Sequence, residues 1–361
     1  MRIPRVRLFS LVAVALAVLT GAPASSTPEL QRATDRLVAT SGIPGVITLV
    51  EQNGRRTVAA SGLADIARRQ KIRTGDRFWI GSVTKTFMAV VVMQLVDEGR
   101  ISLDDTVHEL LPGVVRDGRK IRVRHLLSHT SGIPEYMGLQ PFTSAVGANP
   151  RVIIPARRLI ASAAKLPLEF EPGSQAAYSN TNYLVVGEIL MRLTGQSLGR
   201  LLRERVSDPL GLRSTAFESA RRTLSDRQIH GYDVSGLKPR DVSLHRLGGP
   251  WADGALVSSV RDLAVFMGAV LRGKLVPPKL AAQMRTVIDV PGSHGQGLGL
   301  FELRSPCGRK YYGNTGGTPG YATFVAGSRD ARRLVVIADN GISQDALQAM
   351  GKYLDKLLCP G

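Results

Sequence analysis

The chain has 361 residues, with 47 lysines and arginines against 29 aspartates and glutamates, which gives a formal net charge of +18. Hydrophobic residues make up 43% of the chain, and it contains only two cysteines. This composition excludes a disordered chain, a disulfide-rich scaffold, collagen and a coiled coil. The length allows one large domain or two joined lobes. The positive charge suits nucleic acid, and it suits any other anionic surface equally well.

The start of the chain is typical of a secretory signal peptide. Three arginines precede an apolar run over residues 8–19, and Ala22-Pro23-Ala24 then forms a cleavage signal. The apolar run is too short for a comfortable membrane span. We therefore expect a cleaved signal over residues 1–24 and a secreted mature chain over residues 25–361, with an uncleaved anchor as the alternative.

Export changes the meaning of the positive charge. The basic residues are scattered along the chain, and aromatic residues that would stack on bases make up only 5% of it. We expect no nucleic-acid partner, and instead a solvated basic surface that can touch anionic polymers of the cell wall. Cys307 and Cys359 can form a disulfide in an oxidising compartment, and free thiols are the alternative.

Two β-rich regions, one at each end of the mature chain, enclose a mostly helical middle. Near the start, a helix over 29–40 precedes strands over 45–52 and 56–61, and Asn53-Gly54 between the strands predicts a tight hairpin. The other segments show the periodicity or composition of helices or strands. Helices are expected over 83–97, 182–193, 260–271 and 344–358, and further strands over 299–303, 321–326 and 334–338.

This order predicts an α+β fold in which both ends of the chain build one antiparallel sheet flanked by helices. The α/β lobe is expected over about 25–95 plus 290–361, and a mostly helical lobe over about 96–289 is inserted into it. Together the two lobes form a single catalytic domain over 25–361.

The pattern S-x-x-K occurs three times, so its context has to select the functional copy. The three pairs are Ser82/Lys85, Ser162/Lys165 and Ser235/Lys238. Only Ser82 follows a glycine and opens an apolar helix, where the hydroxyl and the ammonium three residues later share one face. Backbone N–H groups at such a helix start can stabilise an oxyanion, and burial of Lys85 would let it act as a base. A simple N-cap role for Ser82 is the alternative.

Two further segments carry groups that suit acyl transfer. In Tyr178-Ser179-Asn180, the Tyr178 hydroxyl can relay a proton, and the Asn180 amide can orient a lysine and hold a substrate carbonyl. Residues 313–320 contain glycines that let a substrate backbone approach a strand edge closely. The N–H of Gly317 would then complete an oxyanion hole with that of Ser82.

Together these segments resemble the serine β-lactamase and penicillin-binding protein family, especially its class C β-lactamase and D-alanyl-D-alanine carboxypeptidase branch. Five segments carry the resemblance in the family's order. They are residues 73–87, 123–134, 170–183, 254–266 and 312–321. The positions of Cys307 and Cys359 are also similar to those of a disulfide in secreted DD-peptidases of actinobacteria.

The resemblance implies a β-lactamase/transpeptidase-like fold and a role for each site residue. Ser82 would be the acylated nucleophile, Lys85 its proton partner and Tyr178 the second acid or base. The substrate would be held by side chains or backbone of Asn180, Asn314, Thr315 and Gly316. No cofactor and no metal are expected, and the family default is a monomer. The pair His125 and His129 lacks the glutamate of a zinc motif, so structural histidines are expected there.

One residue departs from the family pattern. Members usually carry Lys or His where this chain has Asn314, and an amide brings no positive charge for a substrate carboxylate. Either Arg309 or Lys310 compensates, or the substrate depends less on a terminal carboxylate. A D-alanyl-D-alanine carboxypeptidase acting on cell-wall peptides is the first interpretation. A β-lactamase, an esterase or a D-aminopeptidase of the same fold is the alternative, and a catalytically silent peptidoglycan-binding protein is an alternative of another class.

Overall fold

The computed structural model describes residues 26–218, 223–224, 227–245, 249 and 251–359. The expected signal peptide, residues 1–24, lies outside these described residues. Within them, no helix has the length and apolar character needed to cross a bilayer.

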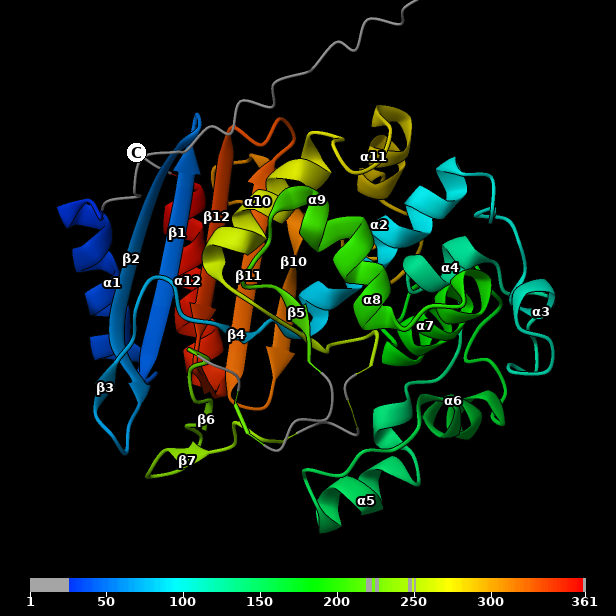
Figure 1. Ribbon diagram of the computed structural model, residues 1–361, viewed down its shortest axis with the longest axis horizontal. Helices are drawn as coiled ribbons and strands as arrows, with labels where there is room; N and C mark the ends of the chain where they lie inside the picture. Colours follow the sequence, from blue (N-terminus) through cyan, green and yellow to red (C-terminus); the bar gives the residue numbers. More distant parts are fainter. Residues whose placement is uncertain (1–25, 219–222, 225–226, 246–248, 250, 360–361) are drawn as a thin grey trace, which may run out of the picture.

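A seven-stranded antiparallel sheet forms the centre of the molecule, in the order β3-β2-β1-β12-β11-β10-β9. Its strands come from both ends of the described chain, as predicted, and the fold is α+β (Figure 1). The strands are β1 (Gly45–Gln52), β2 (Arg55–Asp65), β3 (Gln70–Lys71), β9 (Phe301–Arg304), β10 (Lys310–Thr318), β11 (Tyr321–Ser328) and β12 (Arg333–Asp339).

The β1–β2 hairpin has the tight turn that its sequence predicts. Gln52 pairs with Arg55, so only Asn53 and Gly54 form the loop. Both have positive φ, 50° and 83°, which a two-residue type I′ turn requires and which Asn and Gly tolerate best. The prediction of a hairpin is confirmed.

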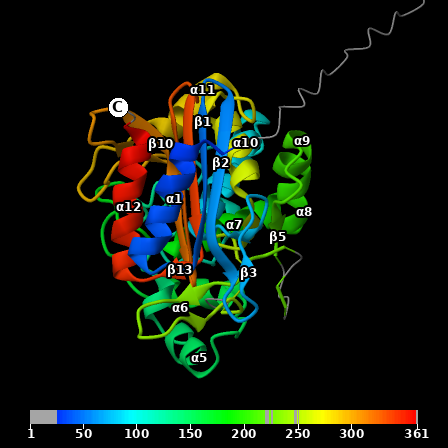
Figure 2. The same ribbon diagram turned by 90° about the vertical axis from the view of Figure 1, so that its left-hand side faces the viewer.

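Helices cover both faces of this sheet. Helices α1 (Pro28–Ser41) and α12 (Gln344–Leu358) lie side by side on one face (Figure 2). Helix α10 (Val260–Leu271) packs on the other face against β1, β11 and β12. Because both faces are covered, β12 is an almost continuous apolar run and is buried along nearly its whole length.

The segment between β3 and β9 contains most of the remaining helices. Helix α2 (Thr84–Asp97) links it to the sheet, and its Phe87 ring stacks on Phe266 of α10 with ring centroids 3.5 Å apart. The other helices are α3 (Val107–Leu110), α4 (Val123–Leu127), α5 (Phe142–Ala148), α6 (Ala156–Ala164), α7 (Asn180–Thr194), α8 (Leu198–Leu202), α9 (Asp208–Leu210) and α11 (Pro278–Arg285). Short helical turns are η1 (Gly81–Val83), η2 (Tyr136–Gly138) and η3 (Arg203–Ser207).

Short strands also occur in this segment. Together with β13, which follows β12, they form two three-stranded sheets, ordered β4-β8-β5 and β13-β6-β7. Their bounds are β4 (Phe78–Trp79), β5 (Ala216–Phe217), β6 (Tyr232–Asp233), β7 (Arg240–Asp241), β8 (Leu256–Ser258) and β13 (Gly341–Ile342). The region over 96–289, expected to be a helical insertion, thus also supplies four short strands. It also contains α10, which packs on the central sheet.

A disulfide joins Cys307, in the β9–β10 turn, to Cys359 at the end of α12. Beside it, the Tyr311 hydroxyl of β10 donates a hydrogen bond of 2.6 Å to the carbonyl of Leu358. The last helix is therefore fixed to the strand that continues into the glycine-rich segment.

Candidate active site

Ser82 and Lys85 lie where β4 turns into α2. Gly81 has a φ of +48°, which lets the backbone turn, and Ser82 then sits in η1 while Lys85 is in the first turn of α2. The three-residue spacing places the hydroxyl and the amine on the same side, as predicted. Lys85 Nζ donates a hydrogen bond of 2.9 Å to Ser82 Oγ.

The Tyr178 hydroxyl approaches the same oxygen from the opposite segment. It donates a hydrogen bond of 2.7 Å to Ser82 Oγ, although the two residues are 96 positions apart in sequence. Ser82 Oγ therefore has two proton-transfer partners within hydrogen-bond distance. This is the nucleophile-and-base geometry that covalent catalysis requires.

The amine of Lys85 is enclosed by acceptors. Its side chain is only 1% exposed, and besides Ser82 Oγ its Nζ contacts Asn180 Oδ1 and the carbonyl of Asp253, each at 2.7 Å. An ammonium has three donors, so these contacts satisfy all of them. The nitrogen also lies 5.1 Å from the centre of the Tyr178 ring.

Glu135 fixes the orientation of Asn180. Its Oε2 accepts hydrogen bonds from Asn180 N at 2.6 Å and Asn180 Nδ2 at 3.0 Å, while Oε1 accepts from Met137 N at 3.0 Å. Since the carboxylate holds the NH₂ end of the amide, Oδ1 must face Lys85. Sequence reasoning missed Glu135; its only signal was its position directly after the 123–134 segment.

The His129 ring packs against the Tyr178 ring. The two rings stack with centroids 4.3 Å apart, and Ser179 N donates to His129 Nδ1 at 3.2 Å. Complete burial, and then the charge of Lys85, lower the pKa of His129 to about 3. The imidazole is therefore neutral and can pack against Tyr178 without adding charge to the site.

Asp253 is a second buried carboxyl group that sequence reasoning missed, and its only signal was its place directly before the 254–266 segment. Its Oδ2 accepts a hydrogen bond of 2.9 Å from the Tyr136 hydroxyl. Burial raises the pKa of Asp253, and the charge of Lys85 opposes that effect. The residue thus holds Lys85 through its carbonyl and is itself held by Tyr136.

The glycine-rich segment forms the facing wall. Strand β9 pairs with β10 only as far as Gly313, so the following part of β10 has an edge that η1 approaches. A Cβ on Gly316 would lie 1.9 Å from the Ile80 carbonyl oxygen, and only hydrogen fits there. At Gly317 nothing lies within 4 Å of that position, and this residue borders the cavity.

Asn314 points away from that cavity. Its side chain is 2% exposed, Nδ2 donates to Thr86 Oγ1 at 3.0 Å, and Oδ1 accepts from Thr315 N at 2.8 Å. Thr315 is exposed on the other face of the strand. Asn314, Thr315 and Gly316 do not border the cavity, whereas Thr318, which was not predicted, does.

The cavity above Ser82 has a volume of about 250 Å³. The structure brings Ser82, Tyr178, Asn180 and Gly317 together in its wall, with Lys85 beneath them. Its full lining is Trp79, Gly81, Ser82, Met137, Tyr178, Asn180, His245, Gly249, Asp253, Gly254, Ala255, Gly317 and Thr318.

The described residues of this wall carry no fixed positive charge. Within the described part of the chain, no arginine and no lysine borders the cavity, and His245 is its sole histidine. Burial, and then the charges of Arg240 and Arg151, lower the pKa of His245, so this ring is neutral at pH 7. Neither Arg309 nor Lys310 reaches the site, since both lie near the opposite end of β10. The described residues also contain no group of three His, Cys, Asp or Glu side chains that suits a metal ion.

Comparison with known proteins identifies the family. A model of the family described as Beta-lactamase matches residues 30–355. The chain belongs to this family. Among curated members of the wider family, it is 29% identical to penicillin-binding protein 4 of Amycolatopsis lactamdurans over 321 residues, 81% of each chain. It is 28% identical to a D-aminopeptidase of Cereibacter sphaeroides over 325 residues, covering 86% of this chain and 59% of that relative.

Solved structures of β-lactamase-like proteins agree with the fold. A D-stereospecific amidohydrolase from Streptomyces sp. superimposes with a TM-score of 0.79 at 31% identity, covering 88% of this chain and 98% of the other. D-amino acid amidase from Ochrobactrum anthropi SV3, complexed with L-phenylalanine amide, gives 0.79 at 25% identity and covers 91% and 96%. The protein is thus a serine hydrolase of the β-lactamase and penicillin-binding protein family, as the sequence predicts.

Proposed function

We propose that the protein hydrolyses amides or esters of D-amino acids through a Ser82 acyl-enzyme and does not require a terminal carboxylate on its substrate. The observation that carries this proposal is the absence of a fixed cation from the described wall of the cavity. Among the described residues of this wall, a buried substrate carboxylate would find no lysine or arginine partner, and an unpaired buried charge is costly. A neutral amide or ester needs only hydrogen-bond partners.

The geometry supports separate proton-transfer roles for Lys85 and Tyr178. Lys85 takes the proton of Ser82 when it acts as a free amine and Oγ attacks the substrate carbonyl, and the N–H groups of Ser82 and Gly317 stabilise the resulting oxyanion. Tyr178, which is 41% exposed and borders the cavity, donates its proton to the leaving nitrogen or oxygen. The proton held by Lys85 then returns to Tyr178. Water attacks the acyl-enzyme and frees Ser82.

The names of similar proteins favour D-configured substrates. One solved relative is named a D-stereospecific amidohydrolase, another a D-amino acid amidase, and a curated relative a D-aminopeptidase. Carboxypeptidase action on D-alanyl-D-alanine peptides is the second candidate, because penicillin-binding protein 4 aligns over most of both chains. Because the Asn314 side chain points away from the cavity, carboxypeptidase action is the weaker candidate.

The place of action is a further part of the proposal. The N-terminal pattern of a basic segment, an apolar run and a small-residue cleavage signal supports export, so the enzyme would act outside the cytoplasm. There, D-amino acid derivatives from cell-wall material are accessible substrates.

A matched substrate pair tests the substrate class. The peptide N-acetyl-D-Ala-D-Ala and its C-terminal amide share the acyl part and differ only in the terminal charge. We expect the amide to have a kcat/KM at least about tenfold higher, since one unpaired buried charge costs more than 1 kcal/mol. A higher value for the free acid would favour the carboxypeptidase. If neither turnover nor Ser82 acylation occurs, the remaining interpretation is a catalytically silent peptidoglycan-binding protein.

A further inference from the structure

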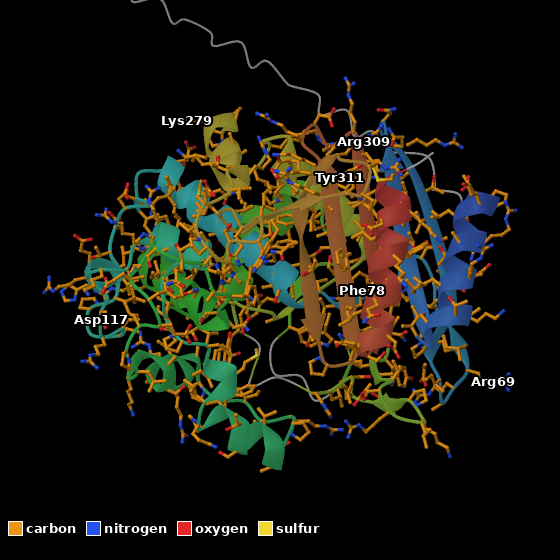
Figure 3. All side chains as sticks on the ribbon, turned by 180° about the vertical axis from the view of Figure 1, so that it is seen from behind. Arg69, Phe78, Asp117, Lys279, Arg309 and Tyr311 are labelled. Atoms are coloured by element: carbon orange, nitrogen blue, oxygen red, sulfur yellow. A yellow bond between two sulfur atoms is a disulfide. The ribbon has the colours of Figure 1, made fainter. Side chains whose placement is uncertain are left out.

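The end of the central sheet that lies farthest from Ser82 gathers positive charge from three turns. These turns, together called the basic end, are residues 51–56, 302–310 and 328–333. The strand register places them together, because Gln52 pairs with Arg333, Tyr311 with Ser328 and Lys310 with Arg304. In Figure 1 this is the upper end of β1, β12, β11 and β10, and Figure 3 shows Arg309 there.

The basic end carries more cations than its carboxylates can neutralise. The three turns contain eight arginines and lysines but only three carboxylates. Each carboxylate already has a basic partner. Glu51 pairs with Arg56, Glu302 with Arg304 and Lys310, and Asp330 with Arg332. Within the described residues, no carboxylate lies within 4.0 Å of Arg55, Arg309, Arg329 or Arg333, and of these Arg333 already donates to the Leu357 carbonyl and to Gln52 Oε1.

These cations are also crowded against one another. Burial, and then the charge of nearby Arg329, lower the pKa of Arg285 at the end of α11. Burial lowers the pKa of Arg333 as well, and the charge of Arg309 adds to that effect. Like charges held this close repel each other, and the repulsion is relieved when an anion binds between them.

The surface between α11 and the β11–β12 turn is hollowed. Arg285, Ser328, Arg329 and Asp330 border an open depression of about 570 Å³. Asp330 contributes one negative charge to this depression, but its Oδ2 faces Arg332 at 3.5 Å, and within the described residues it forms no ion pair with Arg285 or Arg329. An anionic group can therefore enter between the two arginines.

We propose that the basic end is a docking surface for a linear phosphodiester polymer of the cell wall. Arginine side chains suit this partner because their planar guanidinium groups bind phosphate oxygens in pairs. A membrane is the weaker fit, since the exposed large apolar side chains of the described residues, such as Leu237 and Leu347, lie outside these turns. Stacking on nucleic-acid bases also has no aromatic platform in these turns, because Tyr311 and Tyr312 lie beyond them in β10.

The docking surface and the cavity can be occupied at the same time. Strand β10 runs from Lys310 at the basic end to Gly317 in the cavity wall, a span of about 20 Å. A bound polymer would hold the enzyme beside the wall and leave Ser82 open to small substrates. This proposal rests on the proposed export of the chain, and it does not depend on which substrate Ser82 attacks.

Binding of deacylated poly(glycerol phosphate) to the mature chain tests the proposal. The test variant is the triple substitution Arg55→Gln, Arg309→Gln and Arg329→Gln. The control variant, Arg119→Gln, Arg158→Gln and Arg203→Gln, removes three exposed cations of the helical region and has the same net charge. Affinity is measured over a salt series, and turnover of a neutral ester is measured for each variant.

We expect the test variant to bind at least about tenfold more weakly and to lose about two units of the logarithmic salt slope, because three phosphate contacts are removed. The control variant should bind within about twofold of the parent, and all three proteins should hydrolyse the ester equally. Equal weakening in the control variant would overturn the proposal, because only net charge would then matter. So would absence of polymer binding by the parent chain, or tighter binding to duplex DNA or to anionic vesicles.

Discussion

The contact between Glu135 and Asn180 decides which end of an amide faces the catalytic lysine. Glu135 Oε2 accepts from both Asn180 N and Asn180 Nδ2, so Oδ1 is left for Lys85 Nζ at 2.7 Å. In Glu135→Gln, an NH₂ group replaces one acceptor oxygen, and the Asn180 amide can rotate. We expect kcat to fall by about tenfold to a hundredfold with KM nearly unchanged, since Lys85 loses an oriented partner.

Glu169→Gln is the matched control for Glu135→Gln, because it removes an exposed carboxylate outside the cavity wall. It should leave both kinetic constants at the parent values. A rise in KM alone for Glu135→Gln would contradict the positioning role and indicate that Glu135 contacts the substrate.

His245 gives the cavity a charge that depends on pH. Its pKa is lowered by burial, Arg240 and Arg151, against the opposing effect of Asp241 and Asp233, so the ring gains its proton only as the pH falls below its ordinary value of 6.5. Below that pH the wall acquires a cation. For N-acetyl-D-Ala-D-Ala and its amide, the acid-to-amide ratio of kcat/KM should therefore rise as the pH falls.

Because both substrates use the same Ser82, Lys85 and Tyr178, the titration of those groups cancels in the ratio. In His245→Gln the ratio should stay flat with pH. A ratio that rises equally in this variant would assign the pH dependence to another group.

Site residues that stand in short sequence motifs could be predicted. Site residues that act through tertiary contacts could not. Ser82, Lys85, Tyr178 and Asn180 could be named because each stands in a short pattern with a recognisable neighbour. Glu135 and Asp253 act through contacts between segments far apart in the chain, and His245 reaches the cavity wall only through the fold. Glu135 and Asp253 had only their positions beside recognised segments as a signal, and His245 had none.

At the scale of elements, the approach of β10 to η1 shapes the site. A Cβ on Gly316 would lie 1.9 Å from the Ile80 carbonyl oxygen and 3.2 Å from Ser82 N. Gly316→Ala must therefore move the strand away from the nucleophile. We expect a loss of activity of about a hundredfold or more, because misplacement by an ångström is enough for that, and a lower melting temperature.

Gly317→Ala serves as the control for Gly316→Ala, since its Cβ meets nothing within 4 Å. It should keep the melting temperature of the parent. Unchanged activity and stability of Gly316→Ala would show that β10 and η1 are not in such close contact.

The orientation of side chains along β10 explains the limit of the sequence prediction for this element. The glycine-rich composition indicated a strand edge, and η1 does approach the part of β10 that β9 leaves unpaired. Which residues face the cavity depends on the pleat, which places Asn314 toward Thr86 and Thr315 on the opposite face. A shift of one residue would reverse that assignment, and sequence alone does not fix it.

For the whole molecule, the Cys307–Cys359 disulfide is the covalent link between the β9–β10 turn and the last helix. The double substitution Cys307→Ser and Cys359→Ser should lower the free energy of unfolding by about 4 kcal/mol, from the entropy of closing a loop with a sequence separation of 52. Denaturant unfolding measures the change. Activity of the folded variant should stay at the parent level, because neither cysteine borders the cavity; equal stability of the two proteins would contradict the prediction.

The architecture of the whole chain could be predicted because its two ends carry β-rich runs and its middle carries helical periodicity. The packing of α10 on the sheet could not, because its position in the middle of the chain suggests the inserted lobe. The same limit applies to the basic end. Its cations are scattered in sequence, and only the strand register brings them together.

The central claim is that Ser82 is the residue that becomes acylated. Intact-mass and peptide mass spectrometry of the protein after reaction with a fluorescent penicillin whose carboxylate is blocked as an ester test it directly. We predict one covalent adduct on the peptide that contains Ser82, absent in Ser82→Ala and slowed by about a hundredfold or more in Tyr178→Phe. An adduct on Ser162 or Ser235, or one that persists in Ser82→Ala, would contradict this account.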